Sequence, residues 1–116
     1  MNSILNSIKK LVGMDEEETD FDGDIILHIN SAFAILNQLG VGPTTIFAIF
    51  DKDATWDDFI DDDTININHI KTYIGLKVKL WFDPPTNSSV IKAMEEQIRE
   101  LEWRLNVSPS IKEEEE

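Results

Sequence analysis

One stretch of the sequence decides the fold, Asp22–Leu39, which reads DGDIILHINSAFAILNQL. Its apolar residues follow the i, i+3, i+4, i+7 spacing of an amphipathic helix, and they are Ile25, Ile26, Ile29, Ala32, Phe33, Leu36 and Leu39. Acidic residues crowd the first turn, where the helix dipole favours negative charge. Gly40 follows as a helix stop. The stretch therefore predicts a long helix with one buried face.

The same spacing predicts three further helices. Their bounds, indicated by caps and breakers, are Ser3–Val12, capped by Ser3 and ended by Gly13; Asn66 or Asn68 to Phe82, ended by Pro84 and Pro85; and a last helix capped by Ser88 or Ser89 that runs towards Asn106. The last helix carries Glu–Arg pairs at i, i+4 on its outer side, which is typical of a solvated surface.

The sequence that follows the predicted long helix has a less regular hydrophobic pattern. Gly40–Ala54 holds a β-favouring run between turn signals, which predicts an extended loop or a small strand. Thr55 with Asp58 three residues later resembles a capping box, which predicts a helix of one or two turns.

Together these patterns predict an all-α fold, a small helical bundle of about four to five helices with a short extended loop or hairpin between the second and third. A chain of 116 residues, 41% of them hydrophobic, fits one domain. We expect this single domain to cover residues 1–106. Residues 107–116 contain a proline and end in four glutamates, which predicts an acidic, disordered tail.

The net charge of -13 is unevenly distributed along the chain. Asp15–Asp24 and Asp51–Asp63 together hold 14 of the 23 acidic residues, whereas Thr64–Phe82 has three lysines and no acid. The sign of the charge disfavours nucleic-acid binding, which uses Lys and Arg to neutralise phosphates. Separate acidic and basic faces would repel copies of the chain in most orientations and attract them in one.

Composition also bears on location. The chain has no cysteine, which excludes disulfides and thiolate metal sites and indicates a reducing, intracellular compartment. The first twelve residues are amphipathic and unlike a signal peptide. No stretch approaches the roughly 18 apolar residues of a membrane span.

Patterns for metal binding and catalysis are weak. The residues at EF-hand positions 1, 3, 5, 7 and 12 are Asp51, Asp53, Thr55, Asp57 and Asp62. Trp56 occupies the sixth position, where the loop needs glycine, and Asp62 is shorter than the usual glutamate. His28 and His69 belong to no zinc-binding pattern. Without a nucleophile elbow or a phosphate-binding loop either, we expect a protein that binds other proteins, with no enzymatic activity, metal or cofactor.

The three tryptophans complete the set of candidate contact residues. Trp56 and Trp81 lie on apolar faces, at the start or the end of a predicted helix, which predicts core packing. Trp103 is rotated away from Leu101 and Leu105 on the last helix. A helix that is apolar on a second side suggests burial by a partner.

Five strings stand out in chain order after the initial helix: Asp24–Phe33 (DIILHINSAF), Leu36–Pro43 (LNQLGVGP), Ala54–Ile60 (ATWDDFI), Tyr73–Pro85 (YIGLKVKLWFDPP) and Glu102–Asn106 (EWRLN). In this order they resemble the head-tail connector proteins of tailed bacteriophages, also called DNA-packaging or head-completion proteins. The resemblance covers roughly residues 1 to 106.

The resemblance implies a homo-oligomeric ring, a dodecamer in the virion, that lies under the portal, extends the DNA channel and docks the next head-tail component. DNA would pass without sequence-specific binding. Assembly would take place in the host cytoplasm, and the final location would be the virion head-tail junction. We expect the lysines of the basic stretch to bind acids of the adjacent subunit, with Asp51–Asp63 at an interface or channel wall. The predicted interface residues are Asp51, Asp53, Trp56, Asp57, Asp58, Lys71, Lys77, Lys79 and Trp103.

Two other functions remain open from the sequence. The net charge of -13 suits an acidic DNA mimic that inhibits a host DNA-binding protein or nuclease, although the acids lie in two runs separated by a basic helix. An acidic regulatory subunit of a bacterial complex is the third reading.

Overall fold

The computed structural model describes residues 3–43, 45–60 and 65–114, with side chains up to Asn106 except those of residues 65 and 66. Within these residues the chain forms five helices and no strand: α1 (Ile4–Leu11), α2 (Asp22–Gln38), α3 (Trp56–Phe59), α4 (Ile65–Phe82) and α5 (Ser88–Glu114). The predicted all-α bundle is confirmed. The segment before α3 is an extended loop, and one isolated β-bridge joins Thr55 at its end to Ser3.

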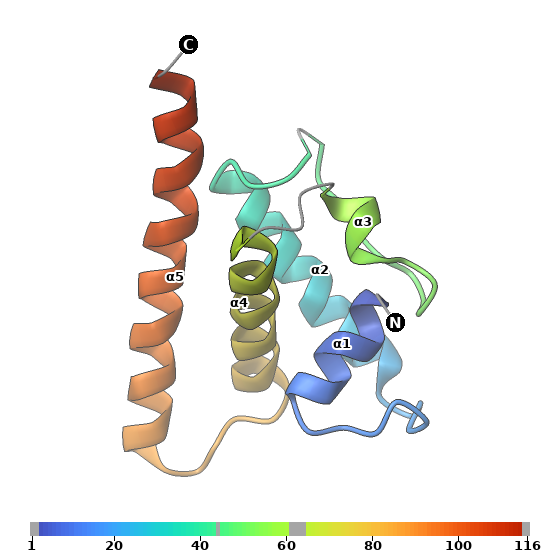
Figure 1. The fold of residues 1–116 in the computed structure, drawn as a ribbon. Helices are drawn as coiled ribbons and strands as arrows, with labels where there is room; N and C mark the ends of the chain where they lie inside the picture. The colour runs from blue at the N-terminus through green and yellow to red at the C-terminus, as the bar shows by residue number, and fades with distance from the viewer. Residues whose placement is uncertain (1–2, 44, 61–64, 115–116) are drawn as a thin grey trace.

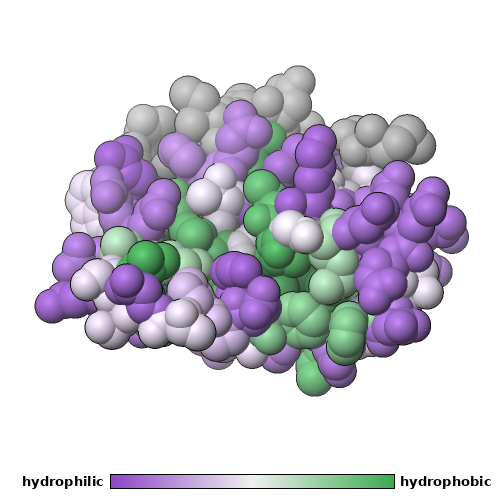
Figure 2. Space-filling model, turned by 90° about the horizontal axis from the view of Figure 1, so that it is seen from below, coloured by the Kyte–Doolittle hydropathy of each residue, from purple (hydrophilic) through white to green (hydrophobic). Residues whose placement is uncertain are grey.

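The helices pack around α4. In Figure 1, α2 crosses behind α4, α1 lies on one side of the pair, and the long α5 stands along the other side. α4 contacts α1, α2 and α5, and α5 has α4 as its main neighbour. Seen from below, the molecule shows hydrophobic atoms in the middle of the face, with hydrophilic atoms on both sides (Figure 2).

Most helix ends follow the predicted local signals. The Ser3 hydroxyl accepts a hydrogen bond from the Asn6 amide at 3.2 Å and so caps α1. Gly13 and Gly40 have φ of +85° and +83°, a backbone conformation that favours glycine after a helix. The Thr55–Asp58 capping box is also present at the start of α3. These ends are predictable because each depends on a few neighbouring residues.

The two ends of α5 differ from the prediction. Asn87, and neither Ser88 nor Ser89, caps the helix, because its side-chain oxygen accepts hydrogen bonds from the Ser89 and Val90 amides at 2.8 and 3.3 Å. Asn and Ser are nearly equivalent as N-caps, so the first of the three in the chain takes the position. α5 also continues past Asn106 to Glu114. The disorder expected for residues 107–116 stays a prediction.

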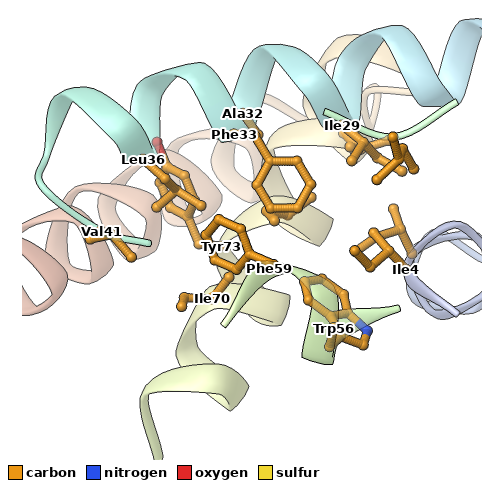
Figure 3. Packing of buried hydrophobic residues seen from close by; sticks show 14 of the residues in the cluster. Ile4, Ile29, Ala32, Phe33, Leu36, Val41, Trp56, Phe59, Ile70 and Tyr73 are labelled. Atoms are coloured by element: carbon orange, nitrogen blue, oxygen red, sulfur yellow. The ribbon is translucent and has the colours of Figure 1, made fainter. Parts of the chain in front are cut away.

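The core joins α2 and α4 to the short α3. Figure 3 shows Phe33 of α2 facing Phe59, with Trp56 beside them; the ring centres of Phe33 and Phe59 are 4.7 Å apart. Gly42 makes this packing possible, since a Cβ on it would lie 2.5 Å from the Phe59 ring and its φ is +90°. The aromatic side chains of α3 therefore anchor a four-residue helix that is too short to be stable alone.

One charged residue lies inside the bundle. Lys9 is 0% exposed, and its Nζ lies 2.8 Å from Asp22 Oδ1 and 2.9 Å from the carbonyl oxygen of Glu16. The ion pair ties α1 to the start of α2, and the carbonyl contact ties it to the loop between them.

Candidate assembly surfaces

The two acidic segments, which lie far apart in the sequence, lie along the same edge of the molecule. The Lys9 side chain holds the loop that carries the first segment. The other end of α1 holds the second, because the Ile4 amide donates to the Ala54 carbonyl at 3.0 Å and the Ser3 hydroxyl donates to the Lys52 carbonyl at 2.7 Å. Both loops lie on the side of the bundle opposite α5 (Figure 1). We call this surface the acidic edge; its described members are Asp15, Glu16, Glu17, Glu18, Asp20, Asp24, Asp51, Asp53, Asp57 and Asp58, all exposed.

Four of the predicted interface residues belong to the acidic edge: Asp51, Asp53, Asp57 and Asp58. The Asp51 carboxylate accepts a hydrogen bond from the Asp53 amide at 2.9 Å, which makes a tight turn at the tip of the loop. Asp58 is used in the α3 capping box, where it accepts from the Thr55 amide at 2.9 Å. Residues 61–63, the rest of the predicted segment, lie outside the described residues.

The three lysines of α4 have partners inside their own chain. Lys71 Nζ lies 5.5 Å from the centre of the Trp56 ring. Lys77 Nζ lies 5.2 Å from the Trp81 ring centre and 3.8 Å from Glu102 Oε2. Lys79 Nζ lies 3.0 Å from Asp83 Oδ2. Their contact with a neighbouring subunit stays a prediction.

Tyr73 was not singled out by the sequence, although its side chain joins α4 to α5. It is 0% exposed, and its hydroxyl donates to Glu102 Oε2 at 2.8 Å. Burial, followed by the hydrogen bond and the negative charge of Glu102, raises the pKa of Tyr73 well above its usual range. The signal that could have found it is its spacing of four residues from Lys77, which places both side chains on the same side of α4.

The tryptophans occupy three different environments. Trp56 is buried in the core and its Nε1–H donates to the Ser7 hydroxyl at 3.2 Å; the interface role predicted for it stays a prediction. The core position predicted for Trp81 is wrong: it is 40% exposed and lies 5.8 Å from the His28 ring. Leu80 and Phe82, on either side of it in the chain, pack against the core, whereas Trp81 lies on the part of the same turn that reaches His28 and solvent. Trp103 is 65% exposed, and its contact with a partner stays a prediction.

Comparison with known proteins gives one match of high coverage. The family model described as "Phage connector protein" matches residues 4–112, from the start of α1 almost to the end of α5. This chain belongs to the phage connector protein family. The resemblance found in the sequence is thereby confirmed. No curated protein and no solved structure gives a significant match.

Membership gives this connector a structural role at the virion head-tail junction, where it interacts with other head or tail proteins of the phage. Among the residues with described side chains, no three His, Asp or Glu come together in a way that could hold a metal ion. None of the helices described here combines the length and hydropathy that crossing a bilayer needs.

Proposed function

We propose that this connector forms a homo-oligomeric ring, a dodecamer in the virion, which lies under the portal, extends the DNA channel and docks the next head-tail component. The observation that carries the proposal is the family match over residues 4–112, which spans all five helices. A ring uses one face of each subunit against a different face of its neighbour. Subunits would assemble in the host cytoplasm before or during attachment to the head.

The acidic edge supports the channel part of the proposal. Ten exposed carboxylates on one edge of a small domain give a strongly negative local potential. Facing the channel, this edge would repel the phosphates and let DNA pass without adhering. Facing a neighbour, it would attract the lysines of α4.

Of these lysines, Lys79 is the most available to a neighbour. Its partner Asp83 is 65% exposed, and an exposed i, i+4 pair contributes only about 0.3–0.5 kcal/mol. Reversing the charges in Lys77→Glu/Lys79→Glu should therefore weaken assembly strongly. Lys92→Glu, an exposed lysine of α5, is the matched control with the same change of charge per site. Intact assembly of the double variant would refute the role of these lysines.

Light scattering coupled to size-exclusion chromatography tests the ring itself. The connector is run across protein concentration and salt, alone and with its cognate portal protein. We expect a ring-sized species, either alone or only with portal, since a connector subunit can stay monomeric until the portal presents its docking surface. If the connector stays monomeric and does not bind the portal protein under any condition, the proposal is refuted.

The acidic edge also favours one alternative, a DNA mimic that inhibits a host DNA-binding protein or nuclease. The fold brings the two acidic runs onto one edge, as a mimic of the phosphate backbone requires. Such a protein would stay a monomer or dimer in the same experiment. It would also capture a basic DNA-binding protein from host lysate in a salt-sensitive manner.

A further inference from the structure

An apolar groove opens where three helices meet. It has a volume of about 470 Å³ and lies between the end of α1, the middle of α4 and the start of α5. Leu11 and Val90 stand at its walls and are 56% and 46% exposed. Leu76 and Met94 add further apolar surface. Exposed apolar surface of this kind marks an interaction site.

The charge of the groove restricts its occupant. Among the described residues that line it, Lys79 is the one ionisable side chain. No carboxylate lines it, and the nearest partner of Lys79 is the exposed Asp83. The groove therefore fits an apolar side chain that is accompanied by negative charge.

The same chain carries a side chain of this kind on its acidic edge. Phe50 is 84% exposed, the highest value among the large apolar residues of the described part, and Asp51 follows it directly. Such exposure of a phenyl ring is unfavourable in an isolated subunit.

The loop presents Phe50 on a rigid support. On one side, the Asn30 side chain donates to the Ile49 carbonyl at 2.9 Å and accepts from the Ile49 amide at 2.8 Å, while Ile49 itself is buried. On the other side, the Lys52 carbonyl accepts the Ser3 hydroxyl. Both ends of the exposed tip are thus fixed to helices, and little conformational entropy would be lost when the ring is covered.

We propose that Phe50 of one subunit inserts into the α1–α4–α5 groove of the next copy of this chain, with Asp51 beside Lys79. The inference rests on the proposed ring and names its subunit contact. A groove of this volume falls in the range of about 300–1,000 Å³ that takes drug-sized groups, so it holds a phenyl ring with adjoining backbone. The loop and the groove lie on different faces of the bundle, since the loop turns at the edge opposite α5 and the groove includes the start of α5 (Figure 1). A contact of this type is head-to-tail and closes into a ring when the rotation allows.

Disulfide cross-linking tests the contact, because the chain has no cysteine of its own. The variant Phe50→Cys/Val90→Cys lacks the phenyl ring, so it is assembled with portal or at about 100 times the concentration that wild type needs. It is then oxidised and separated on a non-reducing gel. We expect a ladder of covalent multimers, since each subunit carries both halves of the contact. The control Leu27→Cys/Val90→Cys places the first cysteine on α2 at a leucine that is 63% exposed, and it should give no ladder. An assembled Phe50→Cys/Val90→Cys variant without a ladder would overturn the proposal.

Truncation gives a second readout. Phe50→Ala should weaken assembly roughly 10- to 100-fold, as expected from losing a buried phenyl ring, and leave unfolding in urea unchanged. Ile46→Ala is the matched control on the same loop, at 63% exposure. If wild type assembles and Phe50→Ala assembles equally well, the Phe50 contact is wrong while the ring stands. If wild type fails to assemble even with portal, both are wrong.

Discussion

Replacing Asp22 with asparagine should destabilise the fold much more than replacing Asp24 with asparagine. Both carboxylates lie in the first turn of α2, but Asp22 faces the fully buried Lys9 at 2.8 Å, whereas Asp24 is exposed. In Asp22→Asn the ammonium of Lys9 keeps neutral acceptors, the carbonyl of Glu16 at 2.9 Å and the amide oxygen at position 22, but loses its counter-charge. A buried charge without a partner is strongly unfavourable.

The magnitude follows from the burial of the pair. Removing one partner of a buried ion pair costs about 3–5 kcal/mol. Because the Asp22 side chain is 27% exposed and the Glu16 carbonyl remains, we expect a smaller loss, about 2–3 kcal/mol of unfolding free energy. Asp24→Asn loses a similar interaction with the helix dipole, about 0.3–1 kcal/mol, and no buried partner. The difference between the two variants isolates the Lys9 contact.

Urea unfolding followed by tryptophan fluorescence measures both variants, since Trp56 is buried in the native state. The double variant Lys9→Met/Asp22→Asn should recover most of the loss, because methionine fills the site of the lysine stem without a charge. Equal unfolding midpoints for Asp22→Asn and Asp24→Asn would refute the reasoning.

Three further variants test the packing of the bundle. Gly42→Ala should cost about 1–3 kcal/mol of stability, because its φ is +90° and its Cβ would meet an aromatic ring; an unchanged urea midpoint would contradict this. Asn30→Ala should cost about 1–3 kcal/mol by leaving the amide and carbonyl of buried Ile49 without partners, a loss that Ser31→Ala, at an exposed neighbouring position, should not show. Tyr73 is the one tyrosine of the chain, so tyrosinate absorbance reports on it alone. Since burial and Glu102 raise its folded-state pKa, stability should fall by about 1.4 kcal/mol per pH unit above its unfolded pKa of about 10. Tyr73→Phe should remove that part of the slope, and native tyrosinate formation near pH 10 would contradict the assignment.

The helices were predictable because their signals are local. The apolar spacing of α2, the Ser3 cap and the Thr55–Asp58 capping box each involve residues within a turn or two of one another. The core position of Trp81 was predicted wrongly, because helical spacing does not show how far the core extends around a turn: Leu80 and Phe82 pack against the core, and Trp81 between them is 40% exposed. The burial of Lys9 was not predicted, since it depends on the Asp22 carboxylate of another helix.

The candidate surfaces were predictable only in part for the same reason. The sequence identifies the two acidic runs as exposed, but only the packing of α1 shows that they share an edge. The exposure of Phe50 was not predicted, because the apolar run around it has no clear period. The two hydrogen bonds between the Asn30 side chain and the Ile49 backbone also join residues that are 19 positions apart in the sequence. The groove is formed by three helices and has no signature in any one of them.

The acidic edge also bears on the choice between the two proposed functions, a ring-forming connector and a DNA mimic. In the sequence, the separation of the acids into two runs disfavours a DNA mimic, and the fold removes that objection by joining the runs around α1. What distinguishes the functions is apolar surface: a mimic needs carboxylates in the place of phosphates and gains nothing from an exposed Phe50 or from an open groove beside Leu11 and Val90. An assembly protein needs both, since charge orients the subunits and apolar burial holds them together. Phe50→Ala should therefore weaken assembly by about 10- to 100-fold but keep any salt-sensitive binding to basic proteins. Neutralising Asp15, Glu16 and Glu17 should reduce that binding and leave the Phe50 contact in place.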